Sequence, residues 1–150
     1  MYFWSMPILR PYNPSDHQQV LNLFLFNTPQ YFCPPEQNDL EQFLKEHAPT
    51  YFVLEESGLI IASGGYHIDG NIGKLSWYMV HPQYHQKGMG SILINNSLKI
   101  LQENLRLTKI EALTSQLAYR FYEKFGFILL ATQENYWGPD MHLYQMELSR

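Results

Sequence analysis

The chain has 150 residues, of which 45% are hydrophobic and 16% are charged, a composition typical of a folded globular protein with one domain. Its formal net charge of −4 argues against nucleic-acid binding, which usually needs a basic face, and favours an amine or polycationic partner. The single cysteine, Cys33, excludes an internal disulfide and a cysteine-rich metal site.

No apolar run approaches the length of about 18 residues that predicts a membrane-spanning helix. Residues 1–5 are aromatic but too short for a signal sequence, and we interpret them as an extension before a single domain of residues 6–150. We therefore expect a cytoplasmic monomer or homodimer that binds neither membrane nor nucleic acid. Nothing near Cys33 supports a catalytic thiol, so a partly buried structural cysteine is the favoured interpretation.

The first third of the chain predicts one strand and two helices. Residues 7–10 resemble a strand, and residues 13–16 supply cap residues for a helix ending near Asn27. Its expected inner face carries Val20, Leu21, Phe24 and Leu25. Residues 28–35, with three prolines, predict an irregular connection to a second helix over residues 36–46. We expect this helix to present an acidic outer face of Glu36, Asp39, Glu41 and Glu46.

The remaining chain alternates between strands and helices. Residues 50–55 and 59–67 predict an antiparallel hairpin, and a second turn at residues 69–71 leads into a strand over residues 74–80. A helix is predicted over residues 88–104, with its apolar face at Ile94, Leu98, Leu101 and Leu105. The last expected elements are a strand, a helix ended by Gly126, and two strands, over residues 108–114, 116–125, 127–132 and 142–148. The order indicates an α+β fold with a mixed, mostly antiparallel sheet of about seven strands and about four helices.

Residues 79–91 pass from a strand through a glycine-bearing loop into the start of a helix. Such a helix start offers backbone N–H groups without partners, and Gly88 and Gly90 lack the Cβ atoms that would hold an anion away. The spacing is neither a Walker loop nor a dinucleotide fingerprint, because the third glycine position falls on Leu93. The pattern therefore indicates a short pyrophosphate cradle, although an isolated glycine pair also suits a plain tight turn.

Two segments together resemble the GNAT superfamily of acyl-CoA N-acyltransferases. The first matches its V-x-P-x-Y and Gly-x-Gly pattern at Val80, Pro82, Tyr84, Gly88 and Gly90. The second, residues 118–127, is similar to A-x-x-[FL]-Y-E-K-x-G-F. The chain departs from the family at His85, where Arg or Gln is usual, and at Ser115, where many members carry Asn. The resemblance covers residues 50–127 best.

The resemblance implies a GNAT-like fold whose sheet splays after the strand 74–80 and admits acyl-CoA. It implies that backbone groups of Tyr78, Met79 and Val80 orient the pantetheine and polarise the thioester carbonyl. The expected pyrophosphate loop consists of His85, Gln86, Lys87, Gly88, Met89, Gly90 and Ser91. Ser115 and Tyr122 complete the expected coenzyme A contacts, and Tyr122 protonates the departing thiolate. The alternative for Tyr122 is simple packing, since it lies on an apolar helical face.

The general base and the acceptor site are less clearly marked. Ser76, Trp77 and Tyr78 fill the strand where many members carry Glu, so Glu36, Asp39 and His67 are candidates by residue type only, and water could also take the proton. The expected acceptor residues are Tyr31, Phe32, Glu36 and Trp137. Trp137 lies in an expected loop of residues 137–140, which is either a lip of the acceptor site or a plain connection. An acidic helix 36–46 beside the site would favour a cationic acceptor.

The leading hypothesis is an N-acetyltransferase that moves an acetyl group from acetyl-CoA to a primary amine of a small molecule or protein, by direct attack in a ternary complex. The alternative is a catalytically weak, CoA-binding sensor or interaction module, which the missing carboxylate on strand 74–80 would suit. No metal is expected, because Pro82 separates His81 from His85 and no further ligands complete a set.

Overall fold

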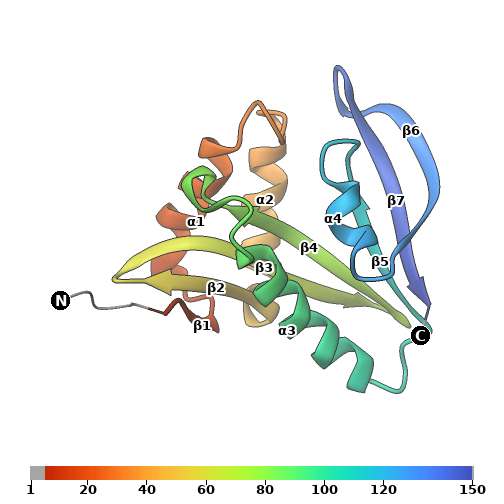
Figure 1. The fold of residues 1–150 in the computed structure, drawn as a ribbon, viewed down its shortest axis with the longest axis horizontal. Helices are drawn as coiled ribbons and strands as arrows, with labels where there is room; N and C mark the ends of the chain where they lie inside the picture. The colour runs from red at the N-terminus through yellow and green to blue at the C-terminus, as the bar shows by residue number, and fades with distance from the viewer. Residues whose placement is uncertain (1–5, 150) are drawn as a thin grey trace.

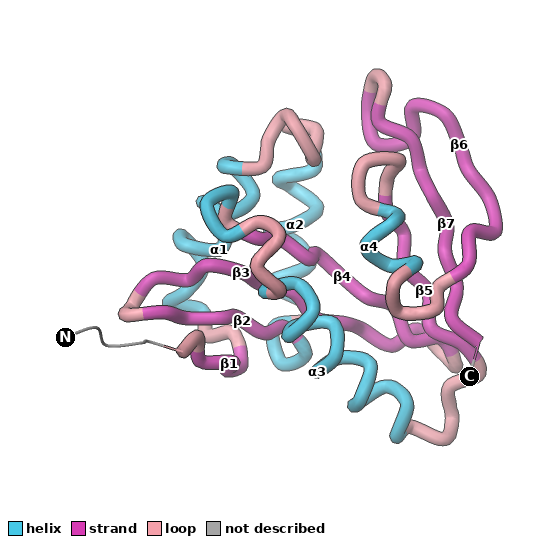
Figure 2. The backbone as a smooth tube through the Cα atoms, viewed as in Figure 1, coloured by secondary structure: helices cyan, strands magenta, loops and turns pink. Residues whose placement is uncertain are grey.

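The computed structural model describes residues 6–149, so the predicted extension of residues 1–5 lies outside the described residues. Seven strands form one sheet in the order β1-β2-β3-β4-β5-β7-β6 (Figures 1 and 2). The strands are β1 Ile8–Pro11, β2 Tyr51–Glu56, β3 Leu59–Asp69, β4 Ile72–Val80, β5 Lys109–Thr114, β6 Ile128–Gly138 and β7 Met141–Ser149. The helices are α1 His17–Phe26, α2 Glu36–Glu46, α3 Met89–Glu103 and α4 Tyr119–Glu123. The predicted α+β fold is confirmed.

The sheet separates two hydrophobic cores. On one face, α1 and α2 pack through Val20, Phe24, Leu40 and Phe43 onto Tyr51 and its neighbours. On the other face, α3 packs on β3 and β4 and α4 packs on β7, with a core that includes Ile94, Leu98, Leu101, Ile110, Tyr122 and Met146. A smaller cluster of Leu54, Ile61, Ala62 and Leu93 joins α3 to β2 and β3. Figure 1 shows α3 crossing in front of the sheet and α1 and α2 behind it. The burial of about 1.5–3 kcal/mol per large apolar side chain holds these layers together.

Three helix predictions need correction. In α1, Leu23 is buried and Leu25 is exposed, because the helix turns its Leu23 edge towards the sheet. Helix α3 ends at Glu103, so Leu105 lies beyond it and is 89% exposed. Helix α4 has only five residues, because the chain before it forms a turn in which Ala118 and Tyr119 N–H both donate to the Ser115 carbonyl. Gly126, with φ of +94°, ends the turn that follows α4.

Strand β6 is longer than predicted and shortens the expected loop of residues 137–140. Trp137 and Gly138 belong to β6, and only Pro139 and Asp140 connect it to β7. The strand is irregular, with a register shift between Gln133 and Gly138. Because nearly the whole strand is exposed on both faces, it lacks the alternation of apolar and polar residues that predicts a strand.

The sheet splits between β4 and β5. These two strands are parallel and pair only over Ile72–Leu75 and Lys109–Ala112. Further along β4, Trp77 and Tyr78 together face Gly64 of β3, and Trp77 adopts a φ of +55°, which defines a β-bulge. Beyond the bulge β4 and β5 diverge, as Figure 1 shows. The backbone of β4 beyond Leu75 is therefore left without a neighbour on the β5 side.

Candidate active site

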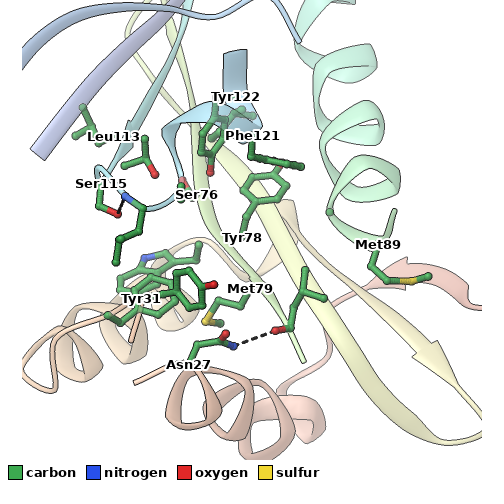
Figure 3. Close-up of a pocket in the computed structure, with 18 of the residues that line it drawn as sticks. Asn27, Tyr31, Ser76, Tyr78, Met79, Met89, Leu113, Ser115, Phe121 and Tyr122 are labelled. Atoms are coloured by element: carbon green, nitrogen blue, oxygen red, sulfur yellow. Dashed lines mark hydrogen bonds between the residues drawn. The ribbon is translucent and has the colours of Figure 1, made fainter. Parts of the chain in front are cut away.

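A cleft of about 980 Å³ occupies the space where β4 and β5 diverge. We call its two walls the α3 side (Tyr78, residues 85–91, Arg120, Phe121, Tyr122 and Lys124) and the α2 side (Tyr31, Phe32, Glu36, Phe43, His67, Trp77 and Trp137). Every site residue predicted from the sequence lines this cleft except Lys87, whose ammonium lies over the ring of Tyr84. Figure 3 shows Tyr31, Ser76, Tyr78, Ser115 and Tyr122 arranged around it.

The loop before α3 presents a row of free backbone amides. Gly88, with φ of +83°, caps α3, and the first helical hydrogen bond runs from Ile92 N–H to the Gly88 carbonyl. Within the described residues 6–149, no hydrogen bond uses the N–H groups of residues 86–91. A Cβ at Gly88 would meet open space, whereas one at Gly90 would lie 3.1 Å from the ring of Phe121. Gly88 thus borders the free space, and Gly90 allows α3 to pack against α4.

His85 ties this loop to the end of β4. Its Nε2 lies 2.9 Å from the Val80 carbonyl oxygen and donates to it, and its ring lies edge-on to Tyr31. Asn27 Nδ2 donates to the same oxygen at 3.0 Å. The Val80 carbonyl is therefore already occupied, and Met79 is paired with Ser63 of β3, so Tyr78 is left of the three residues whose backbone was expected to hold the thioester. His85, which stands where Arg or Gln is usual in the resembling family, thus makes a hydrogen bond of its own to Val80.

Two tyrosines of the α3 side are paired but differ in their hydroxyl groups. Tyr122 is buried in a ring cluster, edge-on to Tyr78 at a centroid distance of 6.4 Å. The Tyr78 hydroxyl donates to Ser97 Oγ at 2.8 Å, whereas the Tyr122 hydroxyl makes no hydrogen bond to the residues that the structure describes. Figure 3 shows the Tyr122 hydroxyl pointing into the cleft. Burial raises the pKa of Tyr122, so its hydroxyl keeps its proton at neutral pH.

The α2 side is aromatic and holds one buried carboxylate. Phe32 and Trp77 pack at 5.8 Å, and Trp137 fixes its indole by donating to the Thr114 carbonyl at 3.0 Å. Glu36 was expected on a solvated outer face, but it is buried, and its Oε2 accepts from Cys33 N–H at 2.8 Å. Burial raises the pKa of the Glu36 carboxyl.

The predicted acidic wall is reduced to Glu36. Glu41 lies 3.7 Å from His17, away from the cleft, and neither Asp39 nor Glu46 lines the cleft. The expectation failed because Glu36 and Phe43 are the residues of α2 that border the open space, and the other three carboxylates point elsewhere. A second carboxylate that does line the cleft, Glu111 of β5, was missed by the sequence analysis; it stands directly opposite Lys74 across the β4–β5 pair.

The connection between α1 and α2 contacts β6, across the split in the sheet, at Cys33 and Gly138. Cys33 belongs to the α1–α2 connection (residues 27–35), and its thiol fills the place that a Cβ at Gly138 would take, 2.5 Å from that position. Burial raises the pKa of the Cys33 thiol, so it stays uncharged at neutral pH. Cys33 does not line the cleft, which supports its interpretation as a structural residue.

His67 and Ser76 form a polar pair on the α2 side. His67 Nδ1 lies 2.9 Å from Ser76 Oγ, and the His67 ring stacks on His47 at 4.7 Å. Both His67 and Ser76 line the cleft. Sequence analysis identified His67 by residue type only, because the pair depends on the register of β3 with β4. The alternation along these strands was the one signal available.

No three side chains of His, Cys, Asp or Glu among residues 6–149 come together as a metal site. His81 packs on Phe26 and Tyr84, and His85 is engaged with Val80 as described above. None of the described helices has both the length and the apolar character needed to cross a membrane.

A split mixed sheet with a glycine loop at the gap is also the fold of solved acetyltransferases. Ard1 from Thermoplasma volcanium superposes with a TM-score of 0.81 at 19% identity, covering 96% of this chain and 97% of that one. The ribosomal-protein-S18-alanine N-acetyltransferase from Escherichia coli gives 0.80 at 16% identity, covering 96% and 94%. An aminoglycoside 6'-N-acetyltransferase complexed with coenzyme A gives 0.72 at 16% identity, covering 95% and 96%. At these identities the likeness concerns the fold.

Sequence comparison identifies the family. The model of the acetyltransferase (GNAT) family matches residues 17–127, and the chain belongs to this family. An amino-acid acetyltransferase from Buchnera aphidicola subsp. Schizaphis graminum is 30% identical over 89 residues. That match covers 58% of this chain, and the chain spans only 20% of the length of this relative.

Proposed function

We propose that this protein transfers an acetyl group from acetyl-CoA to a primary amine of a small molecule or protein, by direct attack in a ternary complex. Membership of the GNAT family supports acetyl transfer, and the split sheet supplies one cleft that both substrates can enter. The single cysteine does not line this cleft, which favours direct attack over transfer through a cysteine acyl-enzyme.

The loop 86–91 fits the pyrophosphate of coenzyme A. Six consecutive N–H groups have no partner among the described residues, and they stand at the positive end of the 15-residue helix α3. Arg120 of α4 and Lys124, the residue directly after α4, line the same side of the cleft and add positive charge. Glycine at position 88 leaves the approach to these amides open. This row of free amides is the observation that carries the proposal.

The remaining α3 side fits the thioester. Tyr78 offers backbone on the part of β4 that has no strand beside it on the β5 side, next to Ser115 across the cleft. Tyr122 holds a protonated hydroxyl aimed into the same space, so it can donate to the departing sulfur. The aromatic α2 side, with Tyr31, Phe32, Glu36 and Trp137, is then left for the acceptor amine.

A charge placed among the free amides tests coenzyme A binding. Ser91→Glu puts a carboxylate into the first turn of α3 facing the cleft, where it suits the helix but repels a pyrophosphate. Ile92→Glu adds the same charge one residue later, at an exposed position that does not line the cleft. By calorimetric titration we expect Ser91→Glu to weaken coenzyme A binding roughly tenfold or more, and Ile92→Glu to leave it nearly unchanged. Equal effects of the two variants would contradict the proposed site.

Turnover separates the enzyme from the alternative, a CoA-binding sensor or interaction module, which the absence of a carboxylate at Ser76, Trp77 and Tyr78 favours. The assay measures free thiol released from acetyl-CoA in the presence of primary amines. The panel contains an amino acid, a peptide with an N-terminal alanine, an aminoglycoside and a polyamine. Release that depends on the amine supports the transferase, whereas tight binding of acetyl-CoA without release for any amine supports the sensor.

A further inference from the structure

We propose that His67 is the general base that takes a proton from the acceptor amine, and that Ser76 is the residue that positions it. This inference deepens the proposed acetyl transfer and rests on it. It addresses the one role for which strand β4 offers no carboxylate, since Ser76 and Trp77 occupy that part of the strand.

The hydrogen bonds around Ser76 define which nitrogen of His67 is free. Ser76 Oγ lies 3.2 Å from the Lys74 carbonyl oxygen, which can only accept, so the single hydroxyl proton points there. Ser76 Oγ then accepts from His67 Nδ1–H at 2.9 Å. The lone pair of the neutral ring is therefore on Nε2. No hydrogen bond among residues 6–149 uses this Nε2, and His67 lines the cleft.

The surroundings keep the ring neutral and fix its plane. His67 stacks on His47 and lies edge-on to Phe43 at 5.9 Å, so its orientation is set by two rings as well as by Ser76. Burial lowers the pKa of His67, and the positive charges of His47 and Lys74 act in the same direction. Asp69 and Glu46 oppose this effect more weakly. A base that is neutral at pH 7 and held in one orientation suits proton transfer.

The base and the acid lie on opposite faces of the sheet. His67 contacts Phe43, a member of the core under α1 and α2, whereas Tyr122 belongs to the core under α3 and α4. The cleft passes between them where β4 and β5 diverge. An amine can thus reach the thioester carbonyl from the α2 side while the sulfur leaves on the α3 side.

Protons and bonds balance in this arrangement. His67 Nε2 takes one proton from the bound ammonium, and the neutral amine then attacks the thioester carbonyl as the nitrogen–carbon bond forms. The carbon–sulfur bond breaks as the Tyr122 hydroxyl gives its proton to the sulfur, and the nitrogen loses its second proton to water. The products are an amide and a free thiol. The His67 imidazolium then loses its proton and the Tyr122 phenolate regains one by exchange with water.

Other cleft residues are less suited to this role. Glu36 already accepts a hydrogen bond from Cys33 N–H. Glu111 lines the cleft and is the competing carboxylate, so it enters the test as its own variant. His47→Gln tests the contribution of the stacked ring, because His47 packs on His67 but does not itself line the cleft.

The experiment measures kcat/KM against pH for the wild type and for the variants His67→Gln, His67→Asn, Glu111→Gln, Ser76→Ala and His47→Gln. The substrates are acetyl-CoA and the most reactive amine of the panel described above. The Asn variant can still donate to Ser76 as Nδ1 does, so it keeps the local hydrogen bond while it removes the base. Thermal unfolding verifies that each variant is folded, and calorimetry measures coenzyme A binding.

We expect wild-type kcat/KM to reach a plateau in mildly acidic solution, because only the neutral base accepts a proton. Both His67 variants should lose roughly 100-fold at pH 7, rise about tenfold per pH unit towards the amine pKa, and bind coenzyme A as before. Ser76→Ala should retain the plateau but shift its onset and lower kcat, and His47→Gln should retain the plateau but move its onset to higher pH, because a positive charge beside His67 is lost. Nitrogen-15 NMR of the protein alone should show His67 with its proton on Nδ1.

Three results would overturn the inference while leaving the proposed acetyl transfer intact: an unchanged plateau in folded His67 variants, loss of the plateau in Glu111→Gln instead, or a His67 proton on Nε2. If the wild type releases no thiol with any amine, the proposed function itself fails. The NMR experiment does not require an active enzyme. It therefore distinguishes failure of the His67 inference from failure of the proposed acetyl transfer.

Discussion

The two sides of the cleft are built from different parts of the chain. The α3 side consists largely of main chain, namely the N–H groups of residues 86–91 and the unpaired part of β4, with Tyr122 as its principal reactive side chain. The α2 side consists of side chains from α2, β3, β4, β6 and the α1–α2 connection. A wall of main chain tolerates changes of side chain, whereas a wall of side chains changes with each substitution. The α3 side therefore suits a ligand that is the same for every acceptor, such as coenzyme A. The α2 side suits the particular acceptor amine of this protein.

The comparison is sharpest at the two tyrosines of the α3 side. Tyr122→Phe keeps the ring contacts and removes a hydroxyl without a protein partner, so kcat should fall roughly ten- to a thousandfold while the unfolding temperature hardly moves. Tyr78→Phe breaks the bond to Ser97 and should cost about 1 kcal/mol of stability with little loss of kcat. Steady-state kinetics and thermal unfolding of both variants check this. Full activity of Tyr122→Phe would reduce that residue to packing.

The same contrast explains what the sequence predicts well. The pattern of residues 79–91 is contiguous, so the strand, the loop and the start of α3 were predicted close to their observed bounds. Helix α2 and the β2–β3 hairpin were also predicted, because their apolar periodicity is regular. Strand β6 was cut short in the prediction, because an edge strand exposed on both faces carries no such period.

The α2 side could be predicted only in part. The pairing of His67 with Ser76 depends on the register that the β3–β4 turn sets, in which His67 stands opposite Lys74, two residues before Ser76. The burial of Glu36 depends on how the α1–α2 connection folds back to bring Cys33 N–H to its carboxylate. Neither contact follows from residue periodicity, because each depends on how two separate segments of the chain are placed next to each other.

The contact between the α1–α2 connection and β6 should be disrupted by adding one methyl group at Gly138. Gly138→Ala places a Cβ on the Cys33 thiol, and such overpacking should cost about 1–3 kcal/mol in the free energy of unfolding, measured with urea. It should also raise KM for the acceptor but leave coenzyme A affinity unchanged, because the α3 side is untouched. The double variant Cys33→Ala, Gly138→Ala restores the space and should recover most of the stability. Additive losses in the double variant would show that the thiol is not the obstacle.

The smallest expected effect concerns the charge of Glu36. Glu36→Gln can still accept from Cys33 N–H but loses its charge, so KM for a cationic acceptor should rise roughly fivefold, about 1 kcal/mol. Asp39→Asn removes a charge that does not line the cleft and should leave KM unchanged. Equal shifts for both variants, abolished by salt, would indicate a diffuse field instead.

The stability of the same variant has a defined pH dependence. Because burial raises the pKa of Glu36, the native state holds this proton more tightly than the unfolded chain, so ionisation at higher pH costs stability. Glu36→Gln should therefore be at least as stable as the wild type at pH 7, and this advantage should shrink towards pH ~4, where the unfolded carboxyl also binds its proton. Unfolding temperatures across this range give the measurement.

The position of Cys33 also makes thiol labelling a measure of how far the α1–α2 connection moves relative to β6. Its thiol is the single one in the chain, is held uncharged by burial, and is covered by Gly138 of β6. Because the thiol packs on Gly138, its reaction with a thiol reagent should become faster whenever the α1–α2 connection moves away from β6. The labelling rate under native conditions therefore reports how often the α1–α2 connection separates from β6 on the acceptor side of the cleft. The measurement needs no substitution in the chain.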